Sequence, residues 1–306
     1  MLKKHRGEFY LFMGALTFSF NGVVSAVVLS HMSAFRLAQM RAISAAILLI
    51  AYARIRKPEF LKFDRKEIPL ILLYGIIGFA FVNVGYFLGI ERGLPLGFVL
   101  ILEYTAPIWI ALWIKYARKG FVAREMWTAI SLSLVGLVLV AKVWDGLTFD
   151  ALGTAGALGS AVALAAYFLM GETVAAHRPA LASAILGLTV AAGFWLLVLP
   201  IWKFPTDVLT MSMNLQGNLS QFNVPGWALI LYIVIAGTIV PYIFVISGLR
   251  LLSASKSSVI GMLEPVMAGI FAWAWLGQSW DVIQLVGAAI VLVGIYLADR
   301  SKSVIK

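Results

Sequence analysis

Two carboxylates lie in the middle of long apolar runs, where an acidic side chain needs a specific reason to be present. Glu103 lies in LPLGFVLILEYTAPIWIALW, and Glu264 lies in SSVIGMLEPVMAGIFAW. An acid at the centre of a membrane helix costs about 2.5–3.5 kcal/mol, so each should face protein or water and not lipid. Either carboxylate could bind a cationic group of a substrate or a proton. The alternative is a neutral carboxyl group hydrogen-bonded between helices.

Other polar residues in the apolar runs could share one cavity with these acids. Arg41 could bind a substrate carboxylate or could pair with an acid for structure, and the structural role is favoured. A mid-membrane tyrosine facing lipid would leave its hydroxyl unpaired, so several tyrosines should point inward. An arginine and glutamates around one cavity would suit a zwitterion such as an amino acid. The predicted substrate- or proton-binding cavity contains Glu103, Glu264, Arg41, Asn21, Asn83, Tyr86, Tyr104, Tyr167 and Tyr242.

Prolines follow the two acids and should bend the helices that carry them. Pro107 cannot donate a backbone hydrogen bond to residue 103, and Pro265 cannot donate one to Gly261. The freed carbonyl oxygens should lie beside the cavity, since non-helical backbone at membrane depth is tolerated only there. The predicted helix-bending positions are Pro107, Pro265 and Pro241.

Composition identifies the elements that must position these residues as membrane-spanning helices. Hydrophobic residues make up 62% of the 306 positions and charged residues only 12%. The mean hydropathy is +0.95. A net charge of +10 would raise nucleic acid as a partner in a soluble chain, but here the basic residues lie in short loops between apolar runs, so no nucleic-acid partner is expected. The chain has no cysteine, and no metal or cofactor site is expected.

Hydropathy predicts an all-α integral membrane protein with ten spans of about 20 residues. With the N-terminus in the cytoplasm, 19 Lys and Arg residues fall on the cytoplasmic side and three on the other, a strong positive-inside bias. Both termini are therefore predicted to be cytoplasmic. The loop Lys203–Pro225 is expected to be a short surface helix or disordered. The predicted spans are 9–30, 34–53, 68–90, 94–116, 126–143, 152–175, 180–202, 226–247, 251–274 and 281–298.

The two halves of the chain resemble each other at an offset of 158 residues. That offset relates Arg92 to Arg250, Pro107 to Pro265, and Gly136 to Gly294. Because each half has five spans, an odd number, the halves should cross the membrane in opposite directions. The charges agree, since the 4–5 loop is basic and its counterpart LGQSWD is not. We expect two inverted five-helix repeats, 1–144 and 145–306, with the binding site where they meet.

Five segments of the apolar spans carry a family resemblance: RAISAAILL, EYTAPIWIAL, LVGLVLV, SASKSSVIGMLEPVMAGIFAWAWLGQ and LVGAAIVLVGIYL. Together they resemble the EamA family of ten-span carriers within the drug/metabolite transporter superfamily. One departure is that members often have Gly-Glu closing spans 4 and 9, where this chain has Lys119-Gly120 and Gly277-Gln278. The resemblance implies an inner-membrane carrier of small metabolites, often an exporter, that works by alternating access.

The sequence therefore predicts a secondary active transporter of the cytoplasmic membrane, and not an enzyme. Its partners should be the lipid bilayer and a small substrate, such as an amino acid or an amphipathic or cationic compound. Protons could be a further partner, if transport is coupled to them. The chain could act as a monomer or a homodimer. A membrane-embedded enzyme and a channel are the alternatives. The chain has no HExxH or Walker A sequence, and the polar residues are isolated instead of repeating along one face as a pore requires.

Overall fold

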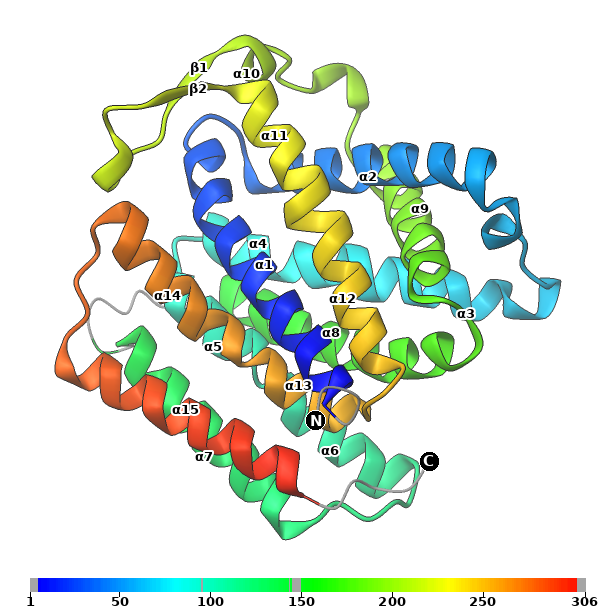
Figure 1. Ribbon diagram of the computed structural model, residues 1–306, viewed down its shortest axis with the longest axis vertical. Helices are drawn as coiled ribbons and strands as arrows, with labels where there is room; N and C mark the ends of the chain where they lie inside the picture. Colours follow the sequence, from blue (N-terminus) through cyan, green and yellow to red (C-terminus); the bar gives the residue numbers. More distant parts are fainter. Residues whose placement is uncertain (1–4, 95, 143, 145–149, 302–306) are drawn as a thin grey trace.

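Ten helices long and apolar enough to span a membrane make up most of the described chain. The computed structural model describes all residues except 1–4, 95, 143, 145–149 and 302–306 (Figure 1). The ten spans agree with the hydropathy prediction to within a few residues at nearly every end. In chain order they are α1 (Arg6–Leu29), α2 (Ala34–Arg56), α3–η3–α4 (Ile68–Leu73, Tyr74–Phe81, Val82–Glu91), α5–α6–η4 (Leu96–Glu103, Ala106–Leu112, Trp113–Ala117), α7 (Arg124–Ala141), α8 (Ala151–His177), α9 (Ala180–Val198), α11–η7–α12 (Gly226–Val234, Ile235–Ile239, Val240–Leu249), α13–α14 (Ala254–Gly261, Leu263–Leu276) and α15 (Val282–Arg300).

Polar side chains cap the N-termini of several of these helices. Ser33 accepts a hydrogen bond from the Arg36 amide, and Asp150 accepts one from the Gly153 amide. Asp281 and Gln284 form a reciprocal capping box at the start of α15. Such partners matter because a helix leaves its first four N–H groups without intrahelical acceptors. The caps fix where spans begin, at the boundary where the sequence changes from polar to apolar.

Four spans are not continuous α-helices, and their irregularities occur in pairs. Span 3 contains the π-helix η3 and span 8 contains the π-helix η7, which ends at Ile239, 158 residues after the end of η3 at Phe81. Span 4 is interrupted at Tyr104, and span 9 is interrupted at Met262, again 158 residues later. Pro107 and Pro265 follow these two interruptions. The irregular backbone therefore occurs at the positions that the sequence offset relates.

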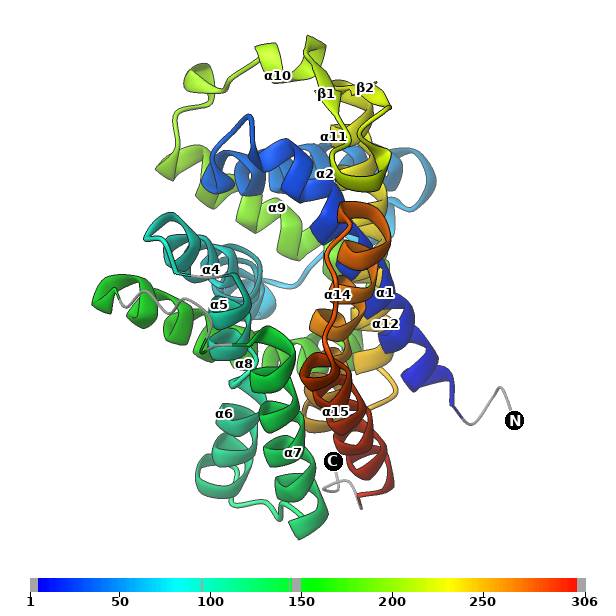
Figure 2. The same cartoon turned by 90° about the vertical axis from the view of Figure 1, so that its left-hand side faces the viewer.

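Helices α7 and α15 pack together along one edge of the bundle, away from α2 and α9 (Figures 1 and 2). They cross antiparallel, because Gly136 faces Gly287 and the earlier residue Ser133 faces the later residue Gly294. At one end, Lys142 forms a 2.5 Å ion pair with Asp281. This bond, together with the amide of Gln284, holds the pKa of the Asp281 carboxyl below its usual value. Spans 5 and 10 thus form a tied pair between the two halves.

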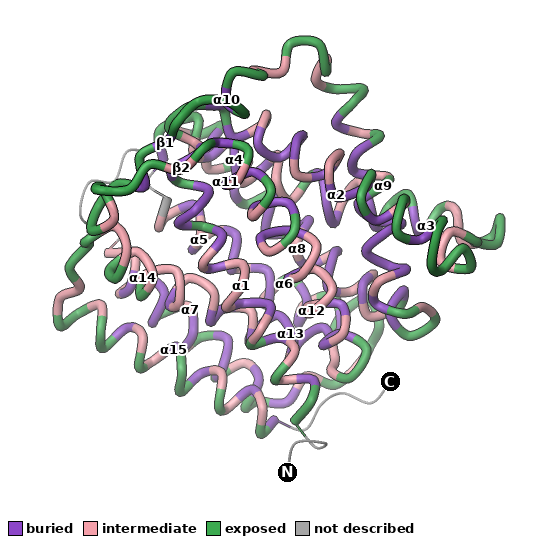
Figure 3. Tube along the Cα trace, turned by 45° about the horizontal axis from the view of Figure 1, so that its top comes forward, coloured by how far each residue is buried: buried purple, intermediate pink, exposed green. Residues whose placement is uncertain are grey.

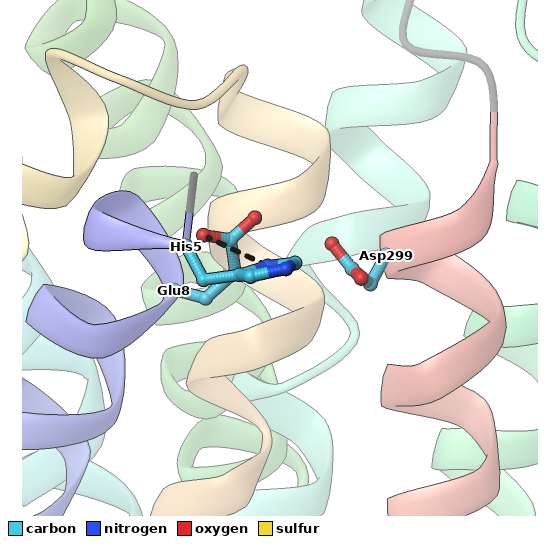
Figure 4. Close-up of side chains that lie close together, drawn as sticks. All are labelled: His5, Glu8 and Asp299. Atoms are coloured by element: carbon cyan, nitrogen blue, oxygen red, sulfur yellow. Dashed lines mark ion pairs between the residues drawn. The ribbon is translucent and has the colours of Figure 1, made fainter. Parts of the chain in front are cut away.

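The start of α1 and the end of α15 lie side by side at one end of the bundle. His5, Glu8 and Asp299 place their ligand atoms within 4.8 Å of one another (Figure 4). The ammonium of Lys256 donates to the carbonyl oxygen of Asp299 at 2.6 Å. Because the number of spans is even, the first helix begins and the last helix ends at the same end of the bundle.

Between spans 7 and 8 the chain forms a small surface structure, of which only a part was expected. We expected a short surface helix or disorder in Lys203–Pro225. The structure has the short helix α10 (Asp207–Thr210), in agreement with the first alternative, and then an antiparallel hairpin of β1 (Ser212–Asn214) and β2 (Asn223–Pro225), with the 3₁₀ turn η6 (Gly217–Leu219) between the strands. Hairpin pairing depends on turn geometry and cross-strand contacts, which a polar composition alone does not reveal. The predicted boundary after residue 144 adjoins residues 143 and 145–149, which lie outside the described residues.

The outer surface of the bundle carries large apolar side chains. Burial is concentrated where helices face one another, whereas exposed residues recur along α15 (Figure 3) and over residues 47–56 of α2. Leu197 is 90% exposed and Val282 74% exposed. Contiguous apolar surface on this scale would be unstable in water but is the ordinary surface of a protein in a bilayer.

The α7–α15 crossing predicts a sharp difference between two glycine-to-alanine substitutions. A Cβ at Gly136 would lie 2.6 Å from the Gly287 carbonyl oxygen and 2.8 Å from the Val291 nitrogen. Because backbone must move to accommodate it, Gly136→Ala should lower the free energy of unfolding by about 1–3 kcal/mol. Thermal unfolding of the purified protein in detergent measures this. Gly159→Ala is the control, since a Cβ there meets nothing within 4 Å. Equal melting temperatures for the two variants would contradict the packing described.

Candidate functional site

Arg41 in α2 is held by the π-helical segment of span 8. Its Nε donates to the Thr238 hydroxyl at 2.9 Å, and its Nη2 donates to the Gly237 carbonyl oxygen at 3.2 Å. Pro241 has no N–H to donate to that carbonyl four residues earlier, so the oxygen is open to another donor. Thr238 in turn donates to the Ile233 carbonyl oxygen at 2.8 Å. The irregular backbone of span 8 therefore supplies the acceptors that orient a guanidinium from the other half of the chain.

Glu264 is held at the point where spans 4 and 9 are both interrupted. The Tyr104 hydroxyl donates to Glu264 Oε2 at 2.9 Å. The Ser19 hydroxyl, from α1, donates to the Glu264 backbone carbonyl at 2.8 Å. Tyr104 lies in the break of span 4, and Glu264 is the second residue of α14 after the break of span 9. Glu264, from the second half, is thus held at its carboxylate and at its backbone carbonyl by hydroxyl groups of the first half.

Glu103 lies on the side of the site where α4 and α8 approach most closely. It is 8% exposed, and its Oε1 is 2.9 Å from the Ser160 hydroxyl. The approach depends on Gly85, because a Cβ there would lie 2.4 Å from the Gly156 carbonyl oxygen and 2.9 Å from the Ser160 nitrogen. Small residues of this spacing let helix backbones pack closely in membranes. The same contact brings Ser160 to the carboxyl group.

These groups form a single electrostatically coupled site. Arg41 interacts with Glu264, Tyr86 and Tyr242. Tyr86 also interacts with Glu103, and Glu103 with Glu264. The site therefore contains side chains from spans 2, 3, 4, 8 and 9, at the centre of the molecule and between its halves.

Several of these side chains lie deep in the bundle and yet keep accessible surface. Arg41, Tyr86, Tyr242 and Glu264 are surrounded by protein but are only partly buried. Beside them, a Cβ at Gly261 would meet Phe168 at 3.7 Å and Tyr104 at 4.0 Å, which are ordinary van der Waals distances. The four polar side chains thus keep surface that a water-sized molecule can contact.

The basic and acidic side chains of the site, Arg41 and Glu264, do not form an ion pair with each other. Arg41 and Glu264 interact electrostatically but are not within the 4.0 Å of an ion pair. Among the residues that the structure describes, no basic group forms an ion pair with Glu103 or Glu264. Buried charges are normally paired, because an unpaired one loses its hydration without compensation. Arg41 and Glu264 therefore each lack an ion-pair partner among the described residues.

The remaining predicted site residues lie around this centre. Asn83 donates to the Phe79 carbonyl oxygen of its own helix at 2.8 Å and lies against Tyr242. Asn21 is buried over Gly237, and its Oδ1 has no partner among the described residues. Tyr167 is 3% exposed and stacks on Tyr74 with ring centroids 5.5 Å apart, one layer outside the charged groups.

Three hydroxyl groups of the site were not singled out from the sequence: Ser19, Ser160 and Thr238. Each is a small residue in an apolar run, which is also the pattern of ordinary helix packing. A signal was available for Thr238, because it lies three residues before Pro241 and next to the carbonyl that this proline frees. For Ser160 the spacing Gly156-x-x-x-Ser160 marked a close helix approach, but not the acid across it.

A second cluster of titratable groups lies at the end of the bundle where the first and last helices meet. His5, Glu8 and Asp299 could geometrically hold a metal ion, although none of the three is buried (Figure 4). Exposed acidic groups of this kind are common without a metal. The cluster has no contact with the central site.

Comparison with known proteins identifies the family pattern in two copies. The model of the EamA-like transporter family matches residues 5–142 and again 151–298. A solved crystal structure superposes with a TM-score of 0.74 at 16% identity, covering 96% of this chain and 98% of the other. That likeness concerns the fold alone.

Curated relatives are similar over most of their length. An uncharacterized transporter, YdfC, of Bacillus subtilis is 24% identical over 87% of this chain and 80% of its own. The threonine/homoserine exporter RhtA of Escherichia coli K12 is 27% identical over 87% of this chain and 83% of its own. An uncharacterized inner membrane transporter, YicL, of Salmonella typhimurium is 23% identical over 95% and 94%.

The partial exposure of these deep polar groups predicts that a cysteine placed beside them can be labelled selectively. Because the chain has no cysteine of its own, a single introduced cysteine is the only thiol that can react. In membranes, Gly261→Cys should react with a small water-soluble thiol reagent, because a thiolate forms only where water reaches it. Val162→Cys is the control, since Val162 is 49% exposed on the apolar surface that faces lipid. Labelling followed by mass spectrometry measures the difference. Equal labelling of both, or labelling of position 162 alone, would contradict a water-accessible centre.

Proposed function

Because the chain belongs to the EamA-like transporter family, we propose that it is a secondary active transporter that exports small zwitterionic metabolites, amino acids foremost, across the cytoplasmic membrane. One observation carries the substrate class. Arg41 and Glu264 interact electrostatically without forming an ion pair, and both keep accessible surface. A zwitterion supplies both missing counter-charges at once.

Arg41 is suited to bind the carboxylate end of the substrate. A guanidinium has five N–H donors, and the contacts to Thr238 and Gly237 engage only Nε and Nη2. The Nη1 donors and the second hydrogen of Nη2 stay available for a carboxylate, which they can bind in a two-point manner. Thr238 and Gly237 hold the guanidinium in place, which reduces the entropy that binding would otherwise lose.

Glu264 is suited to bind the ammonium end of the substrate. Tyr104 occupies one side of Oε2 and leaves the other acceptor positions of the carboxylate open. Tyr86 and Tyr242 lie close enough to both charged groups to line the space between them. Their aromatic faces and hydroxyls would contact the aliphatic part of a small amino acid, in keeping with the mixed lining of ligand sites.

The export direction is supported by the relatives. RhtA is named a threonine/homoserine exporter, and both compounds are small zwitterions. The other two relatives are named only as transporters, which fits a carrier better than an enzyme. L-threonine and L-homoserine are therefore the first substrates to test.

Alternating access would come from two inverted repeats, 1–144 and 145–306, moving about the central site. Two matches of one family model and the paired irregularities of spans 3 and 8 and of spans 4 and 9 support this arrangement. Pro107, Pro265 and Pro241 would be the positions where the helices bend. The excess of basic residues in alternate loops supports cytoplasmic termini.

The two charged positions can be tested separately with ligands that lack one charge. Arg41→Gln should weaken binding of L-threonine by about 10- to 100-fold, the usual loss for a hydrogen bond to a charged group. It should leave the weak binding of the corresponding amine, which has no carboxylate, nearly unchanged. Glu264→Gln should weaken binding of both compounds. Calorimetric titration of the purified protein measures these affinities.

The matched controls are Arg118→Gln and Glu172→Gln. These residues pair with each other at 3.2 Å outside the central site, so each substitution removes the same kind of charge without touching it. Wild-type affinity for L-threonine in both Arg41→Gln and Glu264→Gln would exclude the proposed binding mode. Loss of the same size in the control variants would show that the effect is not specific to the site.

A further inference from the structure

Glu103 belongs to the central site, but its surroundings differ from those of Glu264. The groups that face it are Ser160 on α8, Tyr86 on α4, Tyr104 at the break of span 4, Tyr242 on α12 and Glu264 on α14. None of them is basic. A buried carboxylate without a cation, at 8% exposure, is strongly disfavoured relative to the neutral carboxyl group.

The hydrogen bonds of the Ser160 hydroxyl depend on whether Glu103 is protonated or ionised. Its oxygen is 2.9 Å from Glu103 Oε1 and 2.8 Å from the Val82 carbonyl oxygen. A serine hydroxyl has one hydrogen and cannot donate fully to both. If it donates to Val82, the contact with Glu103 is a hydrogen bond only when Glu103 is protonated and donates to Ser160. If Glu103 is ionised, Ser160 turns its hydrogen to the carboxylate and releases Val82.

We propose that Glu103 is a proton-binding residue that exchanges one proton per transport cycle, and that Ser160 positions its carboxyl group and relays its protonation state to span 3. The proton site is separate from the substrate-binding pair Arg41 and Glu264. The proposal rests on the proposed transport function for its role in coupling, but not for the existence of the site.

Competition between the proton and the substrate follows from the closeness of the two acids. Glu103 and Glu264 interact electrostatically, so ionisation of one opposes ionisation of the other. An ammonium group bound beside Glu264 would offset that repulsion, and Glu103 would then release its proton. When the substrate leaves, a proton returns to Glu103. One proton enters the cell for each substrate that leaves, which is proton-coupled antiport.

The relay reaches a part of span 3 that is already irregular. Val82 is the first residue after the π-helix η3, and it is followed at once by Asn83, which lies against Tyr242. With Glu103 protonated, Ser160 ties α8 to Val82 in span 3. With Glu103 ionised, Ser160 keeps its contact with span 4 but releases the Val82 carbonyl of span 3. Ionisation of Glu103 thus removes one of the two contacts that Ser160 makes with the other half.

Infrared difference spectroscopy on the full-length protein in lipid tests the proton site without any substrate. A change of pH should give a band from the C=O stretch of a protonated carboxyl group. The band should disappear in Glu103→Gln and persist in Glu264→Gln. In Ser160→Ala it should move to higher frequency, because the carboxyl group loses its hydrogen-bond partner. Ser133→Ala is the control, since Ser133 is fully buried and its hydroxyl has no partner among the described residues.

Proteoliposomes test the coupling. In wild-type protein a pH gradient should drive accumulation of L-threonine, and Glu103→Gln should lower that accumulation at least about tenfold, the loss expected when one charged interaction is removed. Exchange of labelled for unlabelled L-threonine without a gradient should persist in this variant. Gradient-driven accumulation by Glu103→Gln at the wild-type level would overturn the proposal, as would a carboxyl band that neither Glu103→Gln nor Ser160→Ala alters. Failure of the wild-type protein to move any zwitterion would instead contradict the proposed function, and the infrared result would still decide the proton site.

Discussion

The structure depends on one constraint, which is that a charged or polar group inside a bilayer must find its partners within the protein. Ten spans are overwhelmingly apolar, and the three charged side chains at their depth, Arg41, Glu103 and Glu264, converge at one place. There the partners are unusual ones: a carbonyl oxygen beside Pro241, hydroxyls of Ser160 and Thr238, and the phenol of Tyr104. Irregular backbone is tolerated at membrane depth only where it is covered by protein or borders an aqueous space. The interrupted spans satisfy that condition and at the same time create the site.

Most contacts of the site join the two halves of the chain. Arg41 is held by span 8, Glu264 by Tyr104 of span 4, and Glu103 by Ser160 of span 6. A movement of one half against the other must therefore change the surroundings of all three charged groups. By contrast, α7 and α15 are tied by glycine contacts along their length and by the Lys142–Asp281 pair at one end. The two halves are thus joined by close glycine packing at one edge and by polar contacts at the centre.

The spans could be predicted from sequence because apolarity along the chain is a local property. The same holds for Glu103, Glu264 and Arg41, since a charge inside an apolar run is conspicuous wherever it points. The partners could not be predicted, because Ser160 and Thr238 resemble packing residues until the helix opposite them is known. The facing of tyrosines was equally undetermined, and the structure places Tyr167 in an aromatic stack beside the site. The hairpin between spans 7 and 8 went unpredicted because short strands are specified by pairing and not by composition.

A carrier of the kind proposed has one central site that each side of the membrane reaches in turn. Counterflow tests this most directly. Proteoliposomes loaded with unlabelled L-homoserine are diluted into a trace of labelled L-threonine, and the internal label is followed over time. A carrier predicts a transient rise of internal label above its final equilibrium value, because outward-moving substrate returns the site loaded with label. A steady approach to equilibrium with no such rise, at a rate that does not saturate with concentration, would contradict it.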